Sequence, residues 1–358
     1  MRILIAMSGG VDSSVAALLM QKAGHDCIGC TMKLYDAPPA ETGGSRTCCA
    51  LEDVEDARSV AFRLDIPYYV FNFKEDFRSK VIEKFIRSYE AGLTPNPCID
   101  CNRHLKFERL LARAQTLGCE KIATGHYARI AFNGREYVLK KAADPAKDQS
   151  YFLYSMTQEQ LSRTLFPLGE LCKAQTRNMA EENGLINADK RDSQDICFVP
   201  NGDYARVIQA YTGKHYPAGV FQTQSGQVLG KHRGIIHYTV GQRKELGISW
   251  PKPLYVCSIQ AERNAVILGE REALFSRAAV LSKMHWISGA PPRLPLRCLA
   301  KIRSRQPEQT ATVYPQGADG IRIVFDQPQR AVTPGQAAVL YDGEVVLGGG
   351  EIQSAGDT

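Results

Sequence analysis

The sequence has no long apolar run, no low-complexity tract and no internal repeat. No stretch approaches the ~18 consecutive apolar residues that a membrane-spanning helix needs. The chain passes from Met1 directly into a short strand-like segment at residues 2–7, without the pattern of a targeting segment. These absences argue against a membrane partner, and we expect a cytoplasmic globular protein.

The eleven cysteines do not indicate a disulfide scaffold, because a cytosolic chain of 358 residues keeps its thiols reduced. They point to metal, cluster or sulfur chemistry instead. The 44% apolar content suffices for at least one sizeable core, and the length suggests two or three domains. A net charge of +6 and a pI near 8.7 suit a polyanionic partner, although many enzymes that never bind nucleic acid share such values.

A glycine turn follows the first strand-like segment and precedes a helical pattern at 15–23. It reads SGGVDSS at 8–14 and lacks the Gly-Lys-Ser/Thr ending of a Walker loop. Adjacent glycines let backbone N–H groups converge on an anion at a helix N-terminus, so we expect a phosphate site rather than an empty strand-turn-helix corner. The candidate residues of this phosphate site and its surroundings are Ala6, Met7, Ser8, Gly9, Gly10, Val11, Asp12, Ser13, Met32 and Gly125.

Strand and helix patterns alternate through the first third of the chain. We expect further strands at 27–34, 68–73 and 121–124, with a helix at 51–64. This order predicts an α/β fold with a parallel sheet covered on both faces. Ligands of such sheets bind beyond the carboxyl ends of the strands, where the glycine turn, Met32 and residues 125–127 would share one pocket.

Two cysteine segments lie where polar residues give way to apolar ones. Cys98 and Cys101 precede an amphipathic pattern at 105–114, so they occupy a loop or a first helical turn, where a thiolate is favoured. Cys197 stands far along the chain, and no spacing argument brings it to Cys101. We expect six others to be buried small hydrophobic residues and leave Cys48 and Cys49 undecided. The six are Cys27, Cys30, Cys119, Cys172, Cys257 and Cys298.

The SGGVDSS turn resembles the pyrophosphatase loop of enzymes that cleave ATP between the α and β phosphates and activate an oxygen as an adenylate. Over nearly the whole chain the sequence resembles tRNA-specific 2-thiouridylases. The motifs that carry this resemblance are SGGVDSS at 8–14, PNPCIDCN at 95–102, ATGHYAR at 123–129, KDQSYFL at 147–153, DSQDICF at 192–198, TVGQR at 239–243 and TPGQ at 333–336.

The resemblance implies ATP-dependent thiolation at C2 of the wobble uridine of tRNA, with Mg²⁺ at the phosphates and AMP and pyrophosphate as by-products. It implies that Cys197 receives sulfur as a persulfide, and that Cys101 is the partner nucleophile able to form a disulfide with it. The sulfur source, a donor protein or sulfide, stays open. Asn96, Pro97 and Cys98 would line the target base. Candidate tRNA contacts are His126, Lys147, Asp148, Gln149, Arg303, Ser304, Arg305 and Gln336.

Cys98 departs from the family pattern, in which many members carry an Asp that assists proton transfer. Asp100 can replace it only if the segment is extended, because side chains two residues apart diverge by about 200° in a helix. Three cysteines, Cys98, Cys101 and Cys197, also match the number that holds an iron-sulfur cluster with one open iron. We therefore keep a cluster route beside the persulfide route and favour the latter.

The remaining sequence predicts two further units. We expect a catalytic domain at 1–199, a small mainly β domain at 200–272, and a C-terminal β-barrel at 273–358 that contacts tRNA. On a strand, Lys301, Arg303 and Arg305 would share one face. Glu245 stands where the family pattern has Gly, which leaves that loop's geometry open.

Two other functions fit parts of the sequence. Another pyrophosphatase-loop enzyme, such as an amidating synthetase, would explain SGGVDSS but not the pair Cys101 and Cys197. A non-catalytic RNA-binding or iron-sulfur sensing protein would explain the fold but not an intact phosphate loop.

Overall fold

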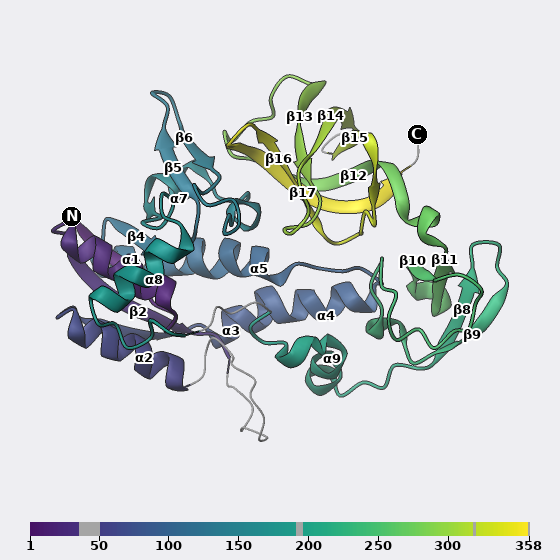
Figure 1. The fold of residues 1–358 in the computed structure, drawn as a ribbon, viewed down its shortest axis with the longest axis horizontal. Helices are drawn as coiled ribbons and strands as arrows, with labels where there is room; N and C mark the ends of the chain where they lie inside the picture. Colours follow the sequence, from purple (N-terminus) through teal and green to yellow (C-terminus); the bar gives the residue numbers. More distant parts are fainter. Residues whose placement is uncertain (36–50, 191–195, 318–319, 357–358) are drawn as a thin grey trace.

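The computed structural model describes residues 1–35, 51–190, 196–317 and 320–356 (Figure 1). Three features of the sequence lie outside these ranges. They are the Pro/Gly-rich segment at 36–46, for which the sequence predicts a mobile loop beside the active site, Cys48 with Cys49, and residues 192–195 of the DSQDICF motif. Among the described residues, no helix combines the length and apolar character needed to cross a membrane.

The N-terminal region is a parallel sheet with strand order β3-β2-β1-β4-β7. Its central strand β1 is a continuous apolar run, and Ile3, Leu4 and Ile5 are fully buried because helices cover both faces. This confirms the predicted α/β class. The strands are β1 Arg2–Ala6, β2 Asp26–Lys33, β3 Tyr68–Asn72, β4 Lys121–Thr124 and β7 Thr164–Leu165, and the helices beside them are α1 Val11–Lys22, α2 Leu51–Arg63, α7 Gln158–Ser162 and α8 Lys173–Glu182.

Two long helical segments run side by side across the centre of the molecule (Figure 1). The second begins at Pro97, eight residues before the amphipathic pattern that predicted it, because proline suits the first helical position. An ion pair between Arg109 and Asp76, with N–O distance 2.6 Å, joins the two. The first comprises α3 Lys74–Phe77, η1 Arg78–Ile82 and α4 Glu83–Glu90, and the second α5 Pro97–Asp100, η2 Cys101–Arg109 and α6 Leu110–Thr116.

The middle region is mainly β, as expected, with sheet order β10-β11-β8-β9. One helix precedes the sheet: its Tyr204 stacks on Tyr89 of α4 with ring centroids 4.6 Å apart, which ties this region to the central helices. Its elements are η4 Pro200–Gly202, α9 Tyr204–Thr212, β8 Gly219–Thr223, β9 Val228–His232, η5 Ile235–His237, β10 Tyr255–Gln260, η6 Ala261–Arg263, β11 Ala265–Gly269 and η7 Arg271–Leu274.

The C-terminal region is a closed barrel, because β12 pairs with both β15 and β17. A hairpin from the N-terminal region extends its sheet through a pairing of Lys140 with Val345. The barrel prediction is confirmed. The barrel strands are β12 Phe275–Trp286, β13 Leu296–Lys301, β14 Gln309–Gln316, β15 Gly320–Arg330, β16 Ala337–Asp342 and β17 Val345–Gly356, and the remaining elements are β5 Arg129–Phe132, β6 Tyr137–Lys140 and η3 Ser150–Phe152.

Glu245 keeps the backbone conformation that glycine favours, with φ of 63°. Its carboxylate forms an exposed ion pair with Arg233 at 3.2 Å, which adds little stability in water. The loop geometry left open by the sequence is therefore retained at a conformational cost of order 1 kcal/mol.

We expect Glu245→Gly to raise the thermal unfolding midpoint by about 2 °C, because relief of the positive φ exceeds the entropy that glycine adds to the unfolded chain. Glu245→Ala is the matched control, since it removes the same ion pair and keeps the Cβ. Calorimetry checks the difference; equal midpoints for the two variants would show that the relief of strain is no larger than the entropy that glycine adds to the unfolded chain.

Candidate active site

The glycine turn forms a compact loop between β1 and α1. Ser13 Oγ donates to the carbonyl of Gly10 at 2.9 Å and accepts from the amide of Ser8 at 3.1 Å. Gly9 has φ of 74°, and a Cβ there would lie 2.3 Å from the carbonyl oxygen of Asp53 on α2. Only glycine fits this position, and the loop presents the N-terminus of α1 as expected of an anion site.

Gly125 directly follows β4, and its backbone packs against the start of α1. A Cβ on Gly125 would lie 2.8 Å from the carbonyl carbon of Asp12 and the amide nitrogen of Ser13. The parallel pairing of β1 with β4 and with β2 places Gly125 and Met32 at the same sheet edge as the glycine turn. The predicted ATP-binding residues are therefore brought together, as the strand order required.

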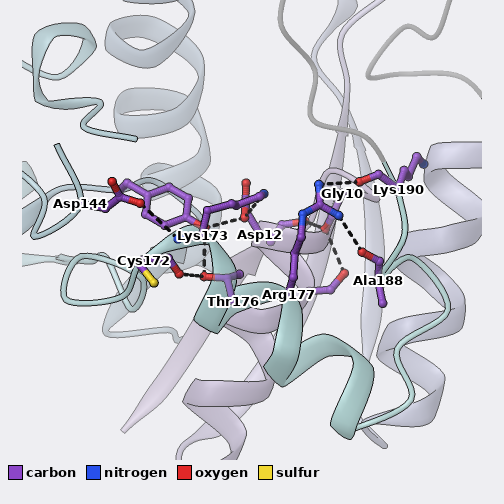
Figure 2. Close-up of polar contacts among 12 residues, drawn as sticks. Gly10, Asp12, Asp144, Cys172, Lys173, Thr176, Arg177, Ala188 and Lys190 are labelled. Atoms are coloured by element: carbon purple, nitrogen blue, oxygen red, sulfur yellow. Dashed lines mark hydrogen bonds and ion pairs between the residues drawn. The ribbon is translucent and has the colours of Figure 1, made fainter. Parts of the chain in front are cut away.

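Asp12 is the electrostatic centre of this edge (Figure 2). Its Oδ1 accepts from the Tyr127 hydroxyl at 2.8 Å and from the ammonium of Lys173 at 2.7 Å. Lys173 lies in the first turn of α8, and its backbone amide donates to Asp144. A cation is thus held beside the loop where phosphates would bring negative charge.

A segment after α8 closes over the other side of the loop. Asn187 Nδ2 donates to the Gly9 carbonyl at 3.0 Å and to Ser14 Oγ at 2.8 Å. Lys190 forms ion pairs with Asp53 and with Asp56 on α2. In Figure 2 a side chain from α8, Arg177, donates to the carbonyls of Ala188 and Lys190. These contacts fix the glycine loop between α2 and α8.

The predicted nucleophile Cys101 lies at the junction of α5 and η2. Cys98 is exposed and Cys101 is half-buried against the core. Positions three apart on a helix lie about 60° apart around its axis, so these two cysteines are neighbours on one face.

Asp100 cannot take the place of the family's aspartate. The segment is helical, so its carboxylate is turned away from Cys98. It is also 4% exposed and paired with Lys84 at 2.8 Å. This answers the question that the sequence left open: no carboxylate replaces the acid at position 98 from within this turn.

Cys197 is held through its backbone carbonyl and through the adjacent residue Phe198. The Tyr35 hydroxyl donates to the Cys197 carbonyl at 2.5 Å. Phe198 packs edge-on against Phe77 and Phe85, with centroids 5.6 and 5.2 Å away. Since α3 also packs on η2, Cys197 is anchored to the helices that adjoin Cys101. The predicted disulfide between the two stays a prediction.

The other cysteines mostly follow expectation. Cys27, Cys30, Cys119 and Cys298 are buried, and the first two belong to cores on opposite faces of the sheet, so they do not form a metal pair. The prediction for Cys172 was wrong. It is exposed because it caps α8, where its amide donates to Gln175 Oε1 at 2.8 Å. Cys257 is half-buried.

His126 is half-buried, and its ring centroid lies 5.8 Å from that of Phe107 and 5.8 Å from that of Phe166. Its Nε2 lies 3.3 Å from the ammonium of Lys106, which can only donate, so its proton resides on Nδ1 toward Thr124 Oγ1 at 2.7 Å. Burial, and then the charge of Lys106, hold the pKa of His126 well below its usual value. Any contact of His126 with tRNA would therefore use a neutral ring.

The KDQ part of KDQSYFL is engaged within the protein. Asp148 accepts from the amides of Ala142 and Ser150 and from the Ser150 hydroxyl, which shapes its own turn. Gln149 and Tyr127 exchange two hydrogen bonds of 2.9 Å. Lys147 adjoins them at a half-buried position. The side chains of Asp148 and Gln149 thus hold the loop that carries the Asp12 partner Tyr127.

The predicted basic face of the barrel was wrong in one respect. Strand β13 ends at Lys301, so Arg303 and Arg305 follow in a turn and do not alternate on a strand. Arg303 bridges two regions by donating to the Val240 carbonyl and to Thr333 Oγ1, and burial lowers its pKa. Ser304 is half-buried, whereas Arg305 is exposed.

Gln336 connects the barrel to the nucleophile segment. Its Nε2 donates to the carbonyls of Thr94, at 2.8 Å, and Pro95, at 3.3 Å, immediately before Asn96. Gly335 makes this docking close, since a Cβ there would lie 2.9 Å from the Thr94 nitrogen. The structure thus gives Gln336 a positioning contact inside the protein.

The chain matches three family models in succession. Residues 1–201 match a tRNA methyl transferase HUP domain, 205–270 a tRNA methyl transferase PRC-barrel domain, and 276–352 an aminomethyltransferase β-barrel domain. The first of these covers more than half of the chain.

Curated relatives match almost the full length. A tRNA-specific 2-thiouridylase MnmA of Symbiobacterium thermophilum is 49% identical, over 99% of this chain and 92% of the relative. That of Acetivibrio thermocellus is also 49% identical, over 98% and 99%. The chain belongs to the tRNA-specific 2-thiouridylase family.

Solved structures match this 2-thiouridylase family member more weakly. A 4-thiouridine synthetase bound to RNA and ATP is 19% identical, covering 55% of this chain and 44% of that one with a TM-score of 0.37. An NMN synthetase from Francisella tularensis is 19% identical, covering 60% and 77% with a TM-score of 0.33.

Sequence patterns did not predict several residues that the structure places around the glycine loop: Lys173, Arg177, Asn187 and Lys190. They lie more than 150 positions beyond the glycine loop and belong to no short motif. One signal was present, since a cysteine followed by a lysine opens a helical pattern after the Gly-Glu-Leu at 169–171. Nothing in that pattern predicts a contact with Asp12, which needs the three-dimensional fold.

Thiol reactivity tests this assignment of the cysteines. Burial raises the pKa of Cys27 and Cys298 to about 11 and that of Cys257 to about 11. Among the cysteines that the structure describes, we therefore expect maleimide at neutral pH to modify the exposed Cys98 and Cys172 before Cys257, whose thiol stays protonated. Peptide mass spectrometry of timed digests measures the order; early modification of Cys27 or Cys298 in the folded protein would contradict it.

Proposed function

We propose that this chain uses ATP to adenylate the C2 oxygen of the wobble uridine in tRNA and replaces that oxygen with sulfur, releasing AMP and pyrophosphate. The observation that carries the proposal is the 49% identity, over 99% of the chain, with a protein named tRNA-specific 2-thiouridylase. Catalysis in place of mere RNA binding is supported by the intact glycine loop and by the cation held against it.

The ATP step uses the sheet edge. Loop amides at the start of α1 would bind the phosphates, and Lys173 would offset their charge after release from Asp12. Asp12 suits Mg²⁺, which usually takes one or two carboxylates together with phosphate oxygens, and the ion would screen charge at the α-phosphate. Tyr127 holds Asp12 in place during this exchange.

The sulfur step uses the cysteines. A persulfide on Cys197 would attack the activated C2 through its terminal sulfur and displace AMP. The thiolate of Cys101 would then attack the Cys197 sulfur, which frees 2-thiouridine and leaves a disulfide between the two cysteines. Asn96, Pro97 and Cys98 form the turn that would face the base.

The cluster route has less support from the arrangement of donors. Within the ranges that the structure describes, no three Cys, His, Asp or Glu side chains are grouped to hold a metal ion. Cys98, Cys101 and Cys197 therefore do not fit a preformed three-thiolate site. We propose the persulfide route, with a donor protein or a small persulfide as the sulfur source.

tRNA is the proposed partner, and the three expected units at 1–199, 200–272 and 273–358 remain our proposed domain division. Arg305 is the predicted tRNA contact whose charge is exposed, whereas Asp148, Gln149, Arg303 and Gln336 hold internal contacts. These four internally bonded residues would contribute to tRNA binding by holding in place the surface that tRNA contacts.

The test combines the chain with ATP, a small-molecule persulfide and a tRNA that carries a wobble uridine. We expect AMP, pyrophosphate and 2-thiouridine in equal amounts, measured by nucleotide chromatography and nucleoside mass spectrometry. AMP without thiolation would favour another pyrophosphatase-loop enzyme, and no ATP cleavage would favour a non-catalytic protein. Methylated nucleoside formed from S-adenosylmethionine without ATP would support the methyl transferase description of the family model.

We expect Lys173→Ala to lower the rate of AMP formation by about 100-fold, the usual cost of losing one charge-stabilising contact in a transition state. The side chain is 13% exposed and paired to Asp12, so its loss removes a preorganised cation. Lys252→Ala is the control, because Lys252 is an exposed lysine paired at 2.8 Å with Glu270 in the middle region. Equal rates for the two variants would remove Lys173 from the ATP site.

A further inference from the structure

Each turn of the persulfide route leaves Cys101 and Cys197 joined, so Cys197 cannot accept new sulfur until that bond is reduced. The proposed function assigns no chemical step to Cys98, the most exposed thiol of the nucleophile segment. The following inference rests on the proposed function and deepens it.

We propose that Cys98 is a resolving thiol: it attacks the Cys101 sulfur of the Cys101–Cys197 disulfide and transfers the oxidation to a Cys98–Cys101 pair. Cys197 then leaves as a thiolate and is ready for the next persulfide. An external dithiol reductant, small or protein-bound, reduces the Cys98–Cys101 pair.

Helix geometry places the two thiols within reach of each other. Pro97 starts the helical turn and Cys98 follows in its first turn, three positions before Cys101. Cβ atoms so spaced lie about 5–6 Å apart. A disulfide needs about 3.5–4.5 Å. The first turn can supply this small adjustment, because helix ends fray and their leading amides are not locked by intrahelical bonds.

The two thiols also differ in accessibility in the required order. Cys101 is half-buried and packs against the core that also receives Cys197, whereas Cys98 faces solvent. The half-buried thiol of Cys101 can thus react with Cys197, and the exposed thiol of Cys98 can react with a soluble reductant. Attack on a disulfide depends on access to the sulfur as well as on thiolate character.

The surroundings leave position 98 suited to thiol chemistry and not to proton transfer. Asp100 points to the opposite side and is buried in an ion pair with Lys84. No carboxylate of this turn therefore substitutes for the family's acid beside Cys101. A thiol at position 98 adds a redox function that an aspartate there cannot have.

The electrons balance over the cycle. The persulfide brings one sulfur at the oxidation level of a disulfide, and Cys101 with Cys197 supplies the two electrons that release it as the sulfur of 2-thiouridine. Exchange by Cys98 moves this oxidation without changing it. One external dithiol per turnover restores Cys98 and Cys101 and becomes a disulfide itself.

The experiment gives the full-length chain one equivalent of glutathione persulfide with ATP and tRNA, in the absence of reductant. The reaction is quenched by acid and alkylation, and disulfide-linked peptides are mapped by mass spectrometry. We expect wild-type protein to contain a Cys98–Cys101 disulfide with Cys197 alkylated. Cys98→Ser and Cys98→Asp should instead accumulate the Cys101–Cys197 disulfide.

Cys172→Ser is the matched control, because it removes another exposed cysteine of the described chain and should give the wild-type map. With a limiting dithiol reductant, wild-type turnover should exceed that of Cys98→Ser, because the reductant meets a disulfide with the exposed Cys98 in place of one between two half-buried cysteines.

A Cys101–Cys197 disulfide in the wild-type protein with Cys98 alkylated would overturn the resolving role while leaving 2-thiouridine formation intact. Stoichiometric iron and sulfide bound through Cys98 in anaerobically purified protein would also overturn it. Absence of 2-thiouridine from the wild-type reaction would instead refute the proposed function. The wild-type map decides the matter even if a Cys98 variant fails to fold.

Discussion

The architecture of the site depends on two places where backbone segments pack so closely that only glycine fits. Gly9 lies against the carbonyl of Asp53 on one side of the phosphate loop, and Gly125 lies against the start of α1 on the other. A methyl group at either point would collide with backbone, which cannot move as a flexible side chain can. The loop is therefore fixed between α2 and β4, and every polar contact around Asp12 depends on that placement.

The nucleotide edge and the thiols occupy different elements, and a short polar chain links them. Thr124 ends β4 and bonds to His126, whose other nitrogen faces Lys106 on the helix that carries Cys101. Burial and the charge of Lys106 hold the pKa of His126 well below its usual value, so the ring carries no charge at neutral pH and the chain of contacts serves to fix positions. From the other side, Gln336 of the barrel fixes the backbone just before that helix. The nucleophile segment is thus positioned by both the sheet and the barrel.

Much of this could be predicted from the sequence, because periodicity reports local structure. An apolar run marked β1, and the strands expected at 27–34, 68–73 and 121–124 coincide closely with β2, β3 and β4. The hairpin at 129–140 and helix α9 were missed, since their burial is decided by distant partners such as Val345 and Tyr89. The same reason explains which site residues could be predicted. The spacing of residues on the glycine loop predicted their role, whereas Lys173 contacts a residue 161 positions away in the sequence.

The basic face expected on the barrel shows how a correct strand can still give a wrong site. Alternation placed three cations on one face, but β13 ends at Lys301 and the chain turns. Arg303 then enters the interface between regions, where its guanidinium bonds to Val240 and Thr333.

Cys98 and Glu245 are two departures from the family pattern with opposite physical consequences. Glu245 leaves the fold unchanged, because the surrounding loop forces the backbone into the conformation that glycine would adopt freely. Its effect is confined to stability. Cys98 imposes no conformational cost, since helical geometry accepts any residue in a first turn, so its effect is confined to chemistry. An exposed thiol one helical turn from a half-buried thiol can form a disulfide with it, which an aspartate cannot. For this reason the substitution at position 98 changes how the enzyme returns to its starting state and not how it folds.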